Sequence, residues 1–156
     1  MMVRPGAKTR AFWTKGPSGY SKAMANSVAM MEPMKFKARD GLEIEVFMTL
    51  PRGSNGKNLP MIVNPHGGPF GPFDQWGFDP EIQLLANRGY AVMQVNFRGS
   101  GNYGQSFMEA GYEQWGKAMQ DDLTDATRWA IQQGIADPNR ICMYGASYGA
   151  YASLMG

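Results

Sequence analysis

The alternation of apolar strands with amphipathic helices is the feature that most limits what this chain can fold into. Short apolar runs predict strands at Met61 to Asn64, Tyr90 to Phe97 and Arg140 to Tyr144. Stretches with helical spacing of apolar residues separate them, at Glu81 to Arg88 and Lys117 to Gln133. Nearly continuous apolar strands are typical of parallel sheets covered by helices on both faces. The sequence therefore predicts an α/β fold with a mostly parallel sheet flanked by helices.

A β-hairpin is predicted before the first of these strands. Met34 to Ala38 and Leu42 to Leu50 are strand-like, and Asp40-Gly41, a favourable pair for a tight turn, lies between them. Residues 1 to 31 show no sustained periodicity and are rich in Gly, Ser, Lys and Met. We expect them to form an irregular segment, separate from a domain over residues 32 to 156.

Capping residues predict where the helices begin and end. Asp79 is the expected N-cap of the first helix, with Pro80 at its first position and Gly89 at its end. One face of the second helix is expected to carry Met119, Leu123, Ala126, Trp129, Ala130 and Gln133, and Gly134 closes it. A turn is expected at Asp137-Pro138-Asn139, before the last strand, and a short helical turn around Phe107 to Ala110.

The composition excludes several classes of site. With 156 residues, 44% of them hydrophobic, the chain can bury the core of one domain. Its single Cys excludes an internal disulfide, and its single His excludes a histidine cluster around a metal. No apolar run approaches the roughly 18 residues that a membrane span needs. We therefore expect no metal, no cofactor and no membrane partner.

The charge is unevenly distributed along the chain. Residues 1 to 39 carry 8 Lys and Arg against 1 acidic residue, whereas residues 40 to 156 carry 7 against 12. This asymmetry suggests two pieces of different origin. The basic residues of the first piece are spread out, unlike the clustered charge of nucleic-acid-binding surfaces. The start also lacks the apolar run of a signal peptide. We expect no nucleic-acid partner and a cytoplasmic location.

The sharpest local motif is Gly145-Ala146-Ser147-Tyr148-Gly149, a G-x-S-x-G between a predicted strand and a predicted helix. A serine nucleophile on a sharp strand-to-helix turn needs neighbours without side chains, because the backbone there is tightly bent. Gly145 and Gly149 meet that need. The amides at the start of the following helix also favour negative charge near Ser147. Ser147 is therefore the candidate nucleophile.

A second motif, Asn64-Pro65-His66-Gly67-Gly68-Pro69, follows the strand that ends at Asn64. Glycines at this place let the backbone turn an N–H toward a cavity, as an oxyanion hole requires. The expected donors are the amides of Gly68 and Tyr148. A plain Gly-Gly-Pro turn is the alternative, and it is weakened because both motifs follow strands in the expected order.

Several segments together follow the pattern of a known family. They are N-P-H-G-G-P (Asn64 to Pro69), L-A-N-R-G-Y-A-V (Leu85 to Val92), N-F-R-G-S (Asn96 to Ser100), Y-G (Tyr103, Gly104), W-G-K-A-M-Q-D-D (Trp115 to Asp122), G-I-A-D-P-N-R (Gly134 to Arg140) and G-A-S-Y-G (Gly145 to Gly149). With them, the stretch from Met34 to Gly156 resembles the start of the catalytic domain of the prolyl oligopeptidase family of serine peptidases. The resemblance is strongest to its acylaminoacyl-peptidase and dipeptidyl-aminopeptidase branch. It implies an α/β-hydrolase domain that follows a β-propeller, with Ser147 as nucleophile and residues 1 to 31 as the end of the propeller.

The chain departs from the family pattern in two places. Ala150 stands where the family often has a second glycine, and its small side chain is expected to do little harm. The triad acid and base follow the serine in α/β-hydrolases, and this sequence ends nine residues after Ser147. His66 precedes the serine within the oxyanion motif, so we do not assign it as the base. We expect a partial α/β-hydrolase fold that is inactive on its own.

Other candidate sites have simpler interpretations. Gly99 to Gly104 fits G-x-G-x-x-G, but its position does not open a helix within a first βα unit, so dinucleotide binding is not expected. Arg98 is expected to anchor a loop rather than to touch substrate. The acids at Asp121, Asp122 and Asp125 are expected to favour the start of a helix, and Cys142 to be a small core residue.

The function predicted from these observations is serine-type peptidase activity on a peptide substrate. Ser147 would attack the scissile carbonyl while the amides of Gly68 and Tyr148 hold the oxyanion. An α/β-hydrolase esterase is the nearest alternative. A remnant that binds a partner without catalysis is the alternative of another class. The oligomeric state is left open by the sequence.

Overall fold

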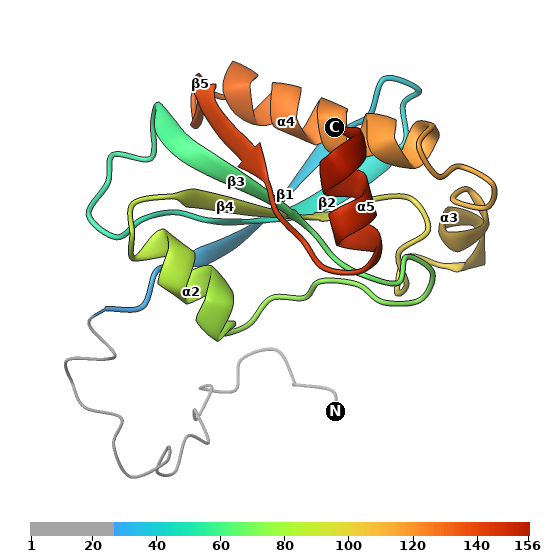
Figure 1. Ribbon diagram of the computed structural model, residues 1–156, viewed down its shortest axis with the longest axis horizontal. Coiled ribbons are helices and arrows are strands. Elements are labelled where there is room, and N and C mark those ends of the chain that lie inside the picture. The colour runs from blue at the N-terminus through green and yellow to red at the C-terminus, as the bar shows by residue number, and fades with distance from the viewer. Residues whose placement is uncertain (1–26) are drawn as a thin grey trace, which may run out of the picture.

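The computed structural model describes residues 27–156 (Figure 1). Its strands are β1 (Met31–Lys37), β2 (Glu43–Thr49), β3 (Leu59–Pro65), β4 (Ala91–Asn96) and β5 (Ala136–Met143). Its helices are α2 (Pro80–Ala86), α3 (Gln105–Glu109), α4 (Ala118–Gln132) and α5 (Tyr148–Met155). Most of the segment expected to be irregular, residues 1 to 31, lies outside the described residues. The expectation that it is the end of a propeller therefore stays a prediction.

The strands form one sheet in the order β1-β2-β4-β3-β5. The strands β4, β3 and β5 run parallel, whereas β1 and β2 form an antiparallel hairpin and β2 pairs antiparallel with β4. The α/β class is therefore confirmed, in a sheet that is mixed rather than parallel throughout. The predicted hairpin turn is present, because Gly41 has a φ of 89° and the Ala38 N–H donates to the Leu42 carbonyl at 2.9 Å.

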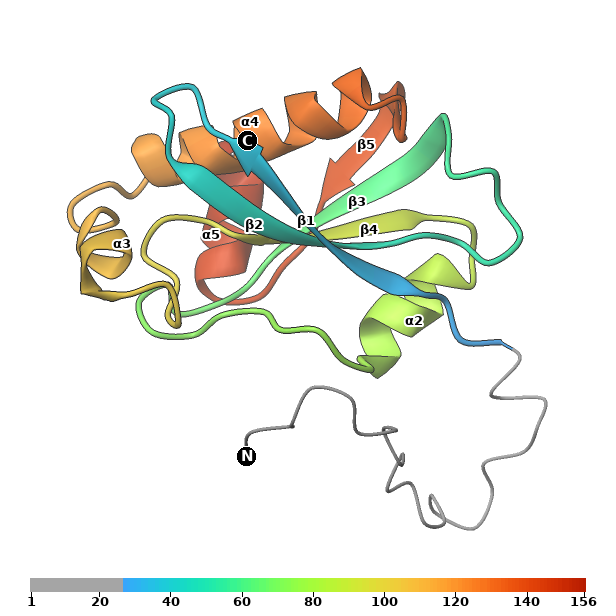
Figure 2. The same cartoon turned by 180° about the vertical axis from the view of Figure 1, so that it is seen from behind.

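Helices cover both faces of the sheet. Figures 1 and 2 show α4 and α5 on one face and α2 on the other. The main core lies between the sheet and α4, where Met61, Met93, Leu123 and Ala126 are fully buried. Burial of this apolar surface is the main force that holds α4 and α5 against the strands. Because β3, β4 and β5 run parallel, their carboxyl ends meet at one edge of the domain.

The predicted helix ends are largely confirmed. Asp79 caps α2, since its Oδ1 accepts the N–H groups of Glu81 at 2.8 Å and Ile82 at 3.0 Å, and Pro80 occupies the first position. On α4 the expected apolar face is buried at Met119, Leu123, Ala126 and Ala130 and partly buried at Trp129, whereas Gln133 follows the helix and is exposed. One member of the buried face was not expected to be there, because Asp122 is fully buried.

The start of β5 differs from the expected turn at residues 137 to 139. The backbone pairs Leu59 with Ala136 and Met61 with Ile141, so the strand includes extra residues as an irregularity. Asn139 still donates its N–H to Asp137 Oδ1 at 2.9 Å, so the local turn lies inside the strand. The turn residues at 137 to 139 therefore do not end the strand, because Ala136 before them and Ile141 after them both pair with β3.

The expectation that Cys142 is a core residue is wrong, because its side chain is exposed. Cys142 pairs with Ile62 and therefore lies on the same face of the sheet, the face that carries α2. The α2 helix packs mainly over β2 and β4. Within residues 27–156, none of the helices has the length and hydropathy that crossing a bilayer requires.

Candidate active site

Ser147 stands on a sharp turn between β5 and α5. Its backbone has a φ of 55° and a ψ of −121°, a combination that glycine accepts easily and other residues rarely adopt. The side chain is exposed, and the next residue, Tyr148, begins the helix. The expected strand, turn and helix around the G-x-S-x-G motif are thus confirmed, with a strained and accessible serine at the bend.

The two glycines of the motif are required by the end of β3. A Cβ on Gly145 would lie 2.7 Å from the carbonyl oxygen of Pro65, and one on Gly149 would lie 2.2 Å from it. Neither position has room for a side chain, because Cβ atoms do not approach backbone oxygens so closely. The turn therefore packs backbone against backbone on the strand that leads into the second motif.

The second motif lies directly against Ser147. A Cβ on Gly67 would be 3.4 Å from the Cβ of Ser147 and 3.9 Å from its Oγ. The next residue, Gly68, has a φ of 125°, which favours glycine. Within residues 27–156, the amide groups of Gly68 and Tyr148 donate no hydrogen bond. The fold thus places Gly67, the residue before Gly68, against Ser147, and Tyr148 follows Ser147 in the chain.

Both ring nitrogens of His66 are used next to the serine rather than on it. Nδ1 lies 2.8 Å from the carbonyl oxygen of Gly67, and Nε2 lies 2.8 Å from the Oγ of Ser100. The ring stacks on Phe97, with centroids 4.5 Å apart. Burial lowers the pKa of His66 below its ordinary value, so the imidazole is neutral at pH 7. This arrangement agrees with the expectation that His66 is not the base.

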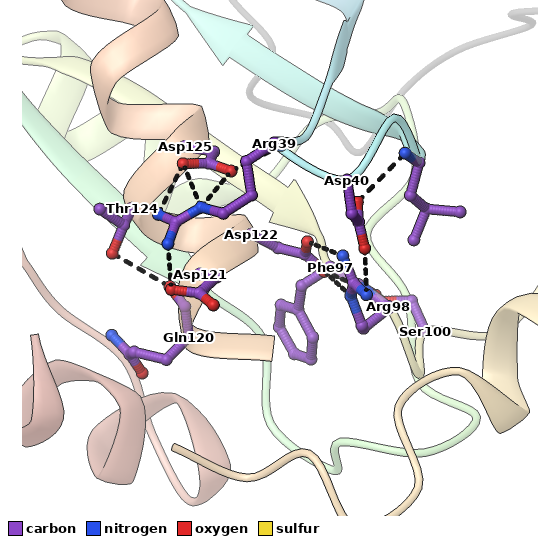
Figure 3. A network of polar contacts seen from close by, with 11 residues as sticks. Arg39, Asp40, Phe97, Arg98, Ser100, Gln120, Asp121, Asp122, Thr124 and Asp125 are labelled. Atoms are coloured by element: carbon purple, nitrogen blue, oxygen red, sulfur yellow. Dashed lines mark hydrogen bonds and ion pairs between the residues drawn. The ribbon is translucent and has the colours of Figure 1, made fainter. Parts of the chain in front are cut away.

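Arg98 anchors the loop after β4, as expected, and its main partner is Asp122. Its Nη2 and Nε donate to the two Asp122 oxygens at 2.7 and 2.9 Å, and its backbone N–H donates at 2.9 Å. Figure 3 shows Arg98 between Asp122 on α4 and Asp40 on the hairpin turn, where Nη1 lies 2.8 Å from Asp40 Oδ2. The hydrogen bonds with Asp122 raise the pKa of Arg98, so the guanidinium stays charged.

The neighbouring acids have a different role. Asp125 accepts the Nη2 of Arg39 at 2.8 Å, and Asp121 accepts its Nη1 at 2.7 Å (Figure 3). These two pairs join the hairpin to α4 at the surface. Asp122 differs because it falls on the apolar face of α4. A carboxylate within an apolar helical stripe requires a buried cation, and this signal in the sequence could have identified the Arg98 pair.

The Tyr148 side chain is buried beneath the turn. Its ring contacts Phe97 at 5.2 Å, Trp115 at 4.9 Å and Tyr151 at 5.8 Å between centroids. The hydroxyl is buried with no hydrogen-bond partner among the described residues. Burial raises the pKa of Tyr148 to about 12, so the phenol stays neutral. This side chain packs the turn, and only the backbone amide of Tyr148 is available to a ligand.

A polar group that the sequence did not reveal supports the loop after β3. Asp74 Oδ1 accepts the Nε2 of Gln94 at 3.0 Å, while Asp74 Oδ2 and Gln94 Oε1 are buried without partners among residues 27–156. Asn96 donates from Nδ2 to the Asp74 carbonyl at 2.9 Å and accepts the Asp74 N–H at 2.7 Å. Burial raises the pKa of Asp74 to about 7. These contacts attach the loop to the end of β4.

Two of the three glycines at 99 to 104, Gly99 and Gly101, serve close packing of loops. A Cβ on Gly101 would lie 2.0 Å from the carbonyl oxygen of Gly71, and Gly101 N–H donates to the Pro72 carbonyl at 3.1 Å. Gly111 approaches Gly99 so closely that its Cβ would be 2.7 Å from the Gly99 Cα. The G-x-G-x-x-G pattern therefore has a packing reason. In the part of the chain that the structure describes, no three His, Cys, Asp or Glu side chains form a possible metal site.

Comparison with known proteins decides the family. A model of the prolyl oligopeptidase family matches residues 76–156, more than half of the chain. The chain belongs to the prolyl oligopeptidase family. Dipeptidyl aminopeptidase BIII of Pseudoxanthomonas mexicana is 40% identical over 131 residues, which cover 80% of this chain and 19% of that protein. The expected resemblance is thus confirmed.

Solved members of the family share the fold. The acylaminoacyl peptidase of Pyrococcus horikoshii superposes with a TM-score of 0.73 at 31% identity, over 83% of this chain and 21% of that one. An acylaminoacyl peptidase in complex with Z-Gly-Gly-Phe-chloromethyl ketone gives a TM-score of 0.73 at 32% identity, over 82% and 21%. The predicted α/β-hydrolase fold is therefore confirmed, and the described sheet is part of it. The chain spans about a fifth of the length of these relatives.

Proposed function

We propose that this chain supplies the nucleophile and the oxyanion donors of a serine peptidase. Ser147 attacks the carbonyl carbon of a peptide bond and forms an acyl-enzyme, which water then hydrolyses. The observation that carries the proposal is the contact between the two motifs, with Gly67 against Ser147 and the strained backbone of Ser147 itself. Membership in the prolyl oligopeptidase family supports peptides rather than other acyl compounds as substrates.

The negative charge that develops on the carbonyl oxygen is held by the amides of Gly68 and Tyr148. Both are unused donors next to Ser147, and the Tyr148 amide is the first of a helix whose dipole favours negative charge. The peptide substrate approaches from the carboxyl ends of the strands, where the loops after β3 and β4 meet the turn. No cofactor is required for this chemistry.

The proton transfers need an imidazole that this chain does not direct at Ser147. Its one histidine, His66, is occupied by Gly67 and Ser100. We therefore propose that residues 1–156 alone do not turn over peptides. Ser147-dependent hydrolysis of a peptide by purified residues 1–156 would refute this part of the proposal.

The test uses the full-length gene product. A fluorophosphonate probe is expected to label the wild type and to leave Ser147→Ala unlabelled, with peptide turnover reduced by about three orders of magnitude or more. The matched control is Ser106→Ala, which removes an exposed serine far along the chain from the motif. Labelling that survives in Ser147→Ala overturns the assignment. Faster turnover of a matched ester with no peptide turnover would favour an esterase.

A further inference from the structure

The orientation of one peptide group decides where the Gly68 amide points. In a trans peptide the C=O and the N–H project to opposite sides of the chain. The cis bond of the described residues is Gly68–Pro69, so the Gly67–Gly68 peptide is trans. A peptide between two glycines can rotate into several orientations at little cost, because neither residue has a Cβ. Something must therefore hold this peptide if Gly68 is to act as a fixed donor.

His66 makes the contact that holds it. Its Nδ1 lies 2.8 Å from the Gly67 carbonyl oxygen, at the end of the peptide opposite the Gly68 N–H. A carbonyl oxygen can only accept, so the hydrogen must be on Nδ1. A flip of the Gly67–Gly68 peptide would break this bond and would place the Gly68 N–H against the ring of His66. The bond therefore selects one of the orientations that the glycines allow.

The ring of His66 is itself fixed from its other side. In the neutral imidazole with hydrogen on Nδ1, Nε2 can only accept, and the hydroxyl oxygen of Ser100 lies 2.8 Å from it. Ser100 is fully buried, and its Oγ also lies 2.6 Å from the Phe97 carbonyl oxygen. That carbonyl has a second donor, because the backbone N–H of Ser100 reaches it at 3.0 Å. The single hydroxyl hydrogen of Ser100 therefore lies between two acceptors, the Phe97 carbonyl oxygen and Nε2, and is shared by both.

The buried Arg98 pair holds Ser100 in place. Arg98 lies between Phe97 and Ser100 in the sequence and is bound through its backbone and side chain to Asp122 (Figure 3). Phe97 and Ser100 consequently present a stacking surface and a hydroxyl to the same imidazole ring. The sequence of contacts runs from α4 through the loop after β4 to the loop after β3, and it ends at Ser147.

We propose that His66 is a positioning residue that orients the Gly67–Gly68 peptide, so that the Gly68 N–H faces the oxyanion formed at Ser147, and that Ser100 orients His66. This inference rests on the proposed function, since it assigns a role within the same site. It predicts that loss of the imidazole weakens binding of the transition state more than binding of the substrate, because only the oxyanion uses the donor fully.

The experiment compares variants of the full-length gene product with a peptide substrate and a peptide boronic acid, which forms a tetrahedral adduct with the serine. His66→Leu is expected to lower kcat by about 10- to 100-fold with KM changed by less than about two-fold. The inhibition constant of the boronic acid should rise by the same factor as kcat falls. His66→Asn keeps a donor near the position of Nδ1 and should recover most of the loss.

Ser100→Ala tests the second half of the proposal. It should lower kcat by about 3- to 10-fold with the same match between kcat and boronic acid affinity. Ser153→Ala is the matched control, because it also deletes a hydroxyl that donates to a backbone carbonyl, that of Gly149 at 2.7 Å, and this hydroxyl makes no hydrogen bond to His66. It should leave kcat and boronic acid affinity unchanged.

The outcomes separate this inference from the proposed function. A wild type without Ser147-dependent labelling overturns the proposed function and the inference with it. A labelled wild type, with kcat of folded His66→Leu within two-fold of it, overturns the inference alone. A fall in kcat without a matching loss of boronic acid affinity also overturns it. If His66→Leu does not fold, Ser100→Ala decides by the same criteria.

Discussion

The carbonyl oxygen of Pro65 occupies the space that a side chain on Gly149 would need, since a Cβ there would lie 2.2 Å away. Pro65 is the last residue of β3, and Gly149 is the second residue of α5. The turn that carries Ser147 is therefore packed directly onto the strand that leads into His66 and Gly67. The two motifs can pack at this distance because Gly149 has no Cβ.

Gly149→Ala should consequently separate the two motifs. Overpacking of this kind costs about 1–3 kcal/mol and can cost more where backbone must move. Thermal unfolding of the full-length protein should show a lower midpoint, and the rate of fluorophosphonate labelling should fall. Gly77→Ala is the control, because a Cβ there would meet nothing within 4 Å and its φ is not positive. Equal labelling rates in the two variants would contradict the prediction.

Ser147→Gly should stabilise the protein while abolishing labelling. Ser147 has a φ of 55° with a ψ of −121°, and the strain of such a conformation is about 1–3 kcal/mol, which glycine relieves. Part of that gain is lost, because glycine has more conformational freedom in the unfolded chain. The midpoint of thermal unfolding should rise relative to Ser147→Ala, which keeps the Cβ and the strain. A midpoint for Ser147→Gly at or below that of Ser147→Ala would show that the turn is not strained.

Asp122→Ala should destabilise far more than Asp121→Ala. The side chain of Asp122 is 0% exposed and that of Asp121 46%, although they are neighbours on α4. Removing one partner of a buried ion pair costs about 3–5 kcal/mol, and Arg98 would then keep only Asp40, a half-exposed carboxylate, as its partner. An exposed pair contributes about 0–1 kcal/mol. Urea unfolding of the full-length variants measures the difference, and equal midpoints would exclude a structural role for the buried pair.

The loop after β3 should lose stability as the pH rises. Burial raises the pKa of Asp74 from 3.8 to about 7, so the folded state resists its ionisation while the unfolded state does not. The protonated Asp74 carboxyl therefore contributes its full stabilisation to the folded loop below pH 4. This stabilisation is lost between about pH 4 and 7, and the free energy of unfolding falls by at most about 1.4 kcal/mol per pH unit. Hydrogen exchange of residues 66–79, corrected for intrinsic rates, should reveal more frequent opening at pH 8 than at pH 5.

Asp74→Asn should remove this pH dependence. The new amide can donate to Gln94 Oε1, which has no partner among the described residues, so the loop should be as stable at pH 8 as at pH 5. Asp137→Asn is the control. The Asn139 backbone and Arg140 hold the pKa of the Asp137 carboxyl below its ordinary value, so this group stays ionised between pH 5 and 8 and its removal should leave the pH dependence unchanged. A pH dependence that persists in Asp74→Asn would assign it to another group.

The local sequence was sufficient for much of the fold. Asp79 with Pro80, Asp40-Gly41 and the apolar spacing of α4 each act over a few residues, so their patterns predicted the first helix, the hairpin and the buried helix face. The same applies to the turn at Ser147, because its glycines are required within the motif itself. These features depend on dihedral preferences and periodicity, which the sequence carries directly.

Other features depended on which segments meet across the fold. Cys142 alternates like a core residue, but α2 packs mainly over β2 and β4, and the Cys142 side chain on β5 is exposed. Asp122 and Arg98 are 24 residues apart, and Asp74 and Gln94 are 20 apart, so no local pattern pairs them. His66 was excluded as the base from its position alone, whereas its bonds to Gly67 and Ser100 appear only once β3 and β4 lie side by side.

The sequence by itself determined which residues can do the chemistry, since a serine between glycines and a glycine-rich loop after a strand are local requirements of backbone geometry. Only the tertiary structure decided how they are held. The pairing of β3 with β4 and β5 brings the loops to one edge, and burial there makes each unpaired polar group costly. Asp122 pairs with the buried guanidinium of Arg98, and Ser100 contacts the imidazole of His66. These partners are far apart in the sequence and meet only in the folded chain.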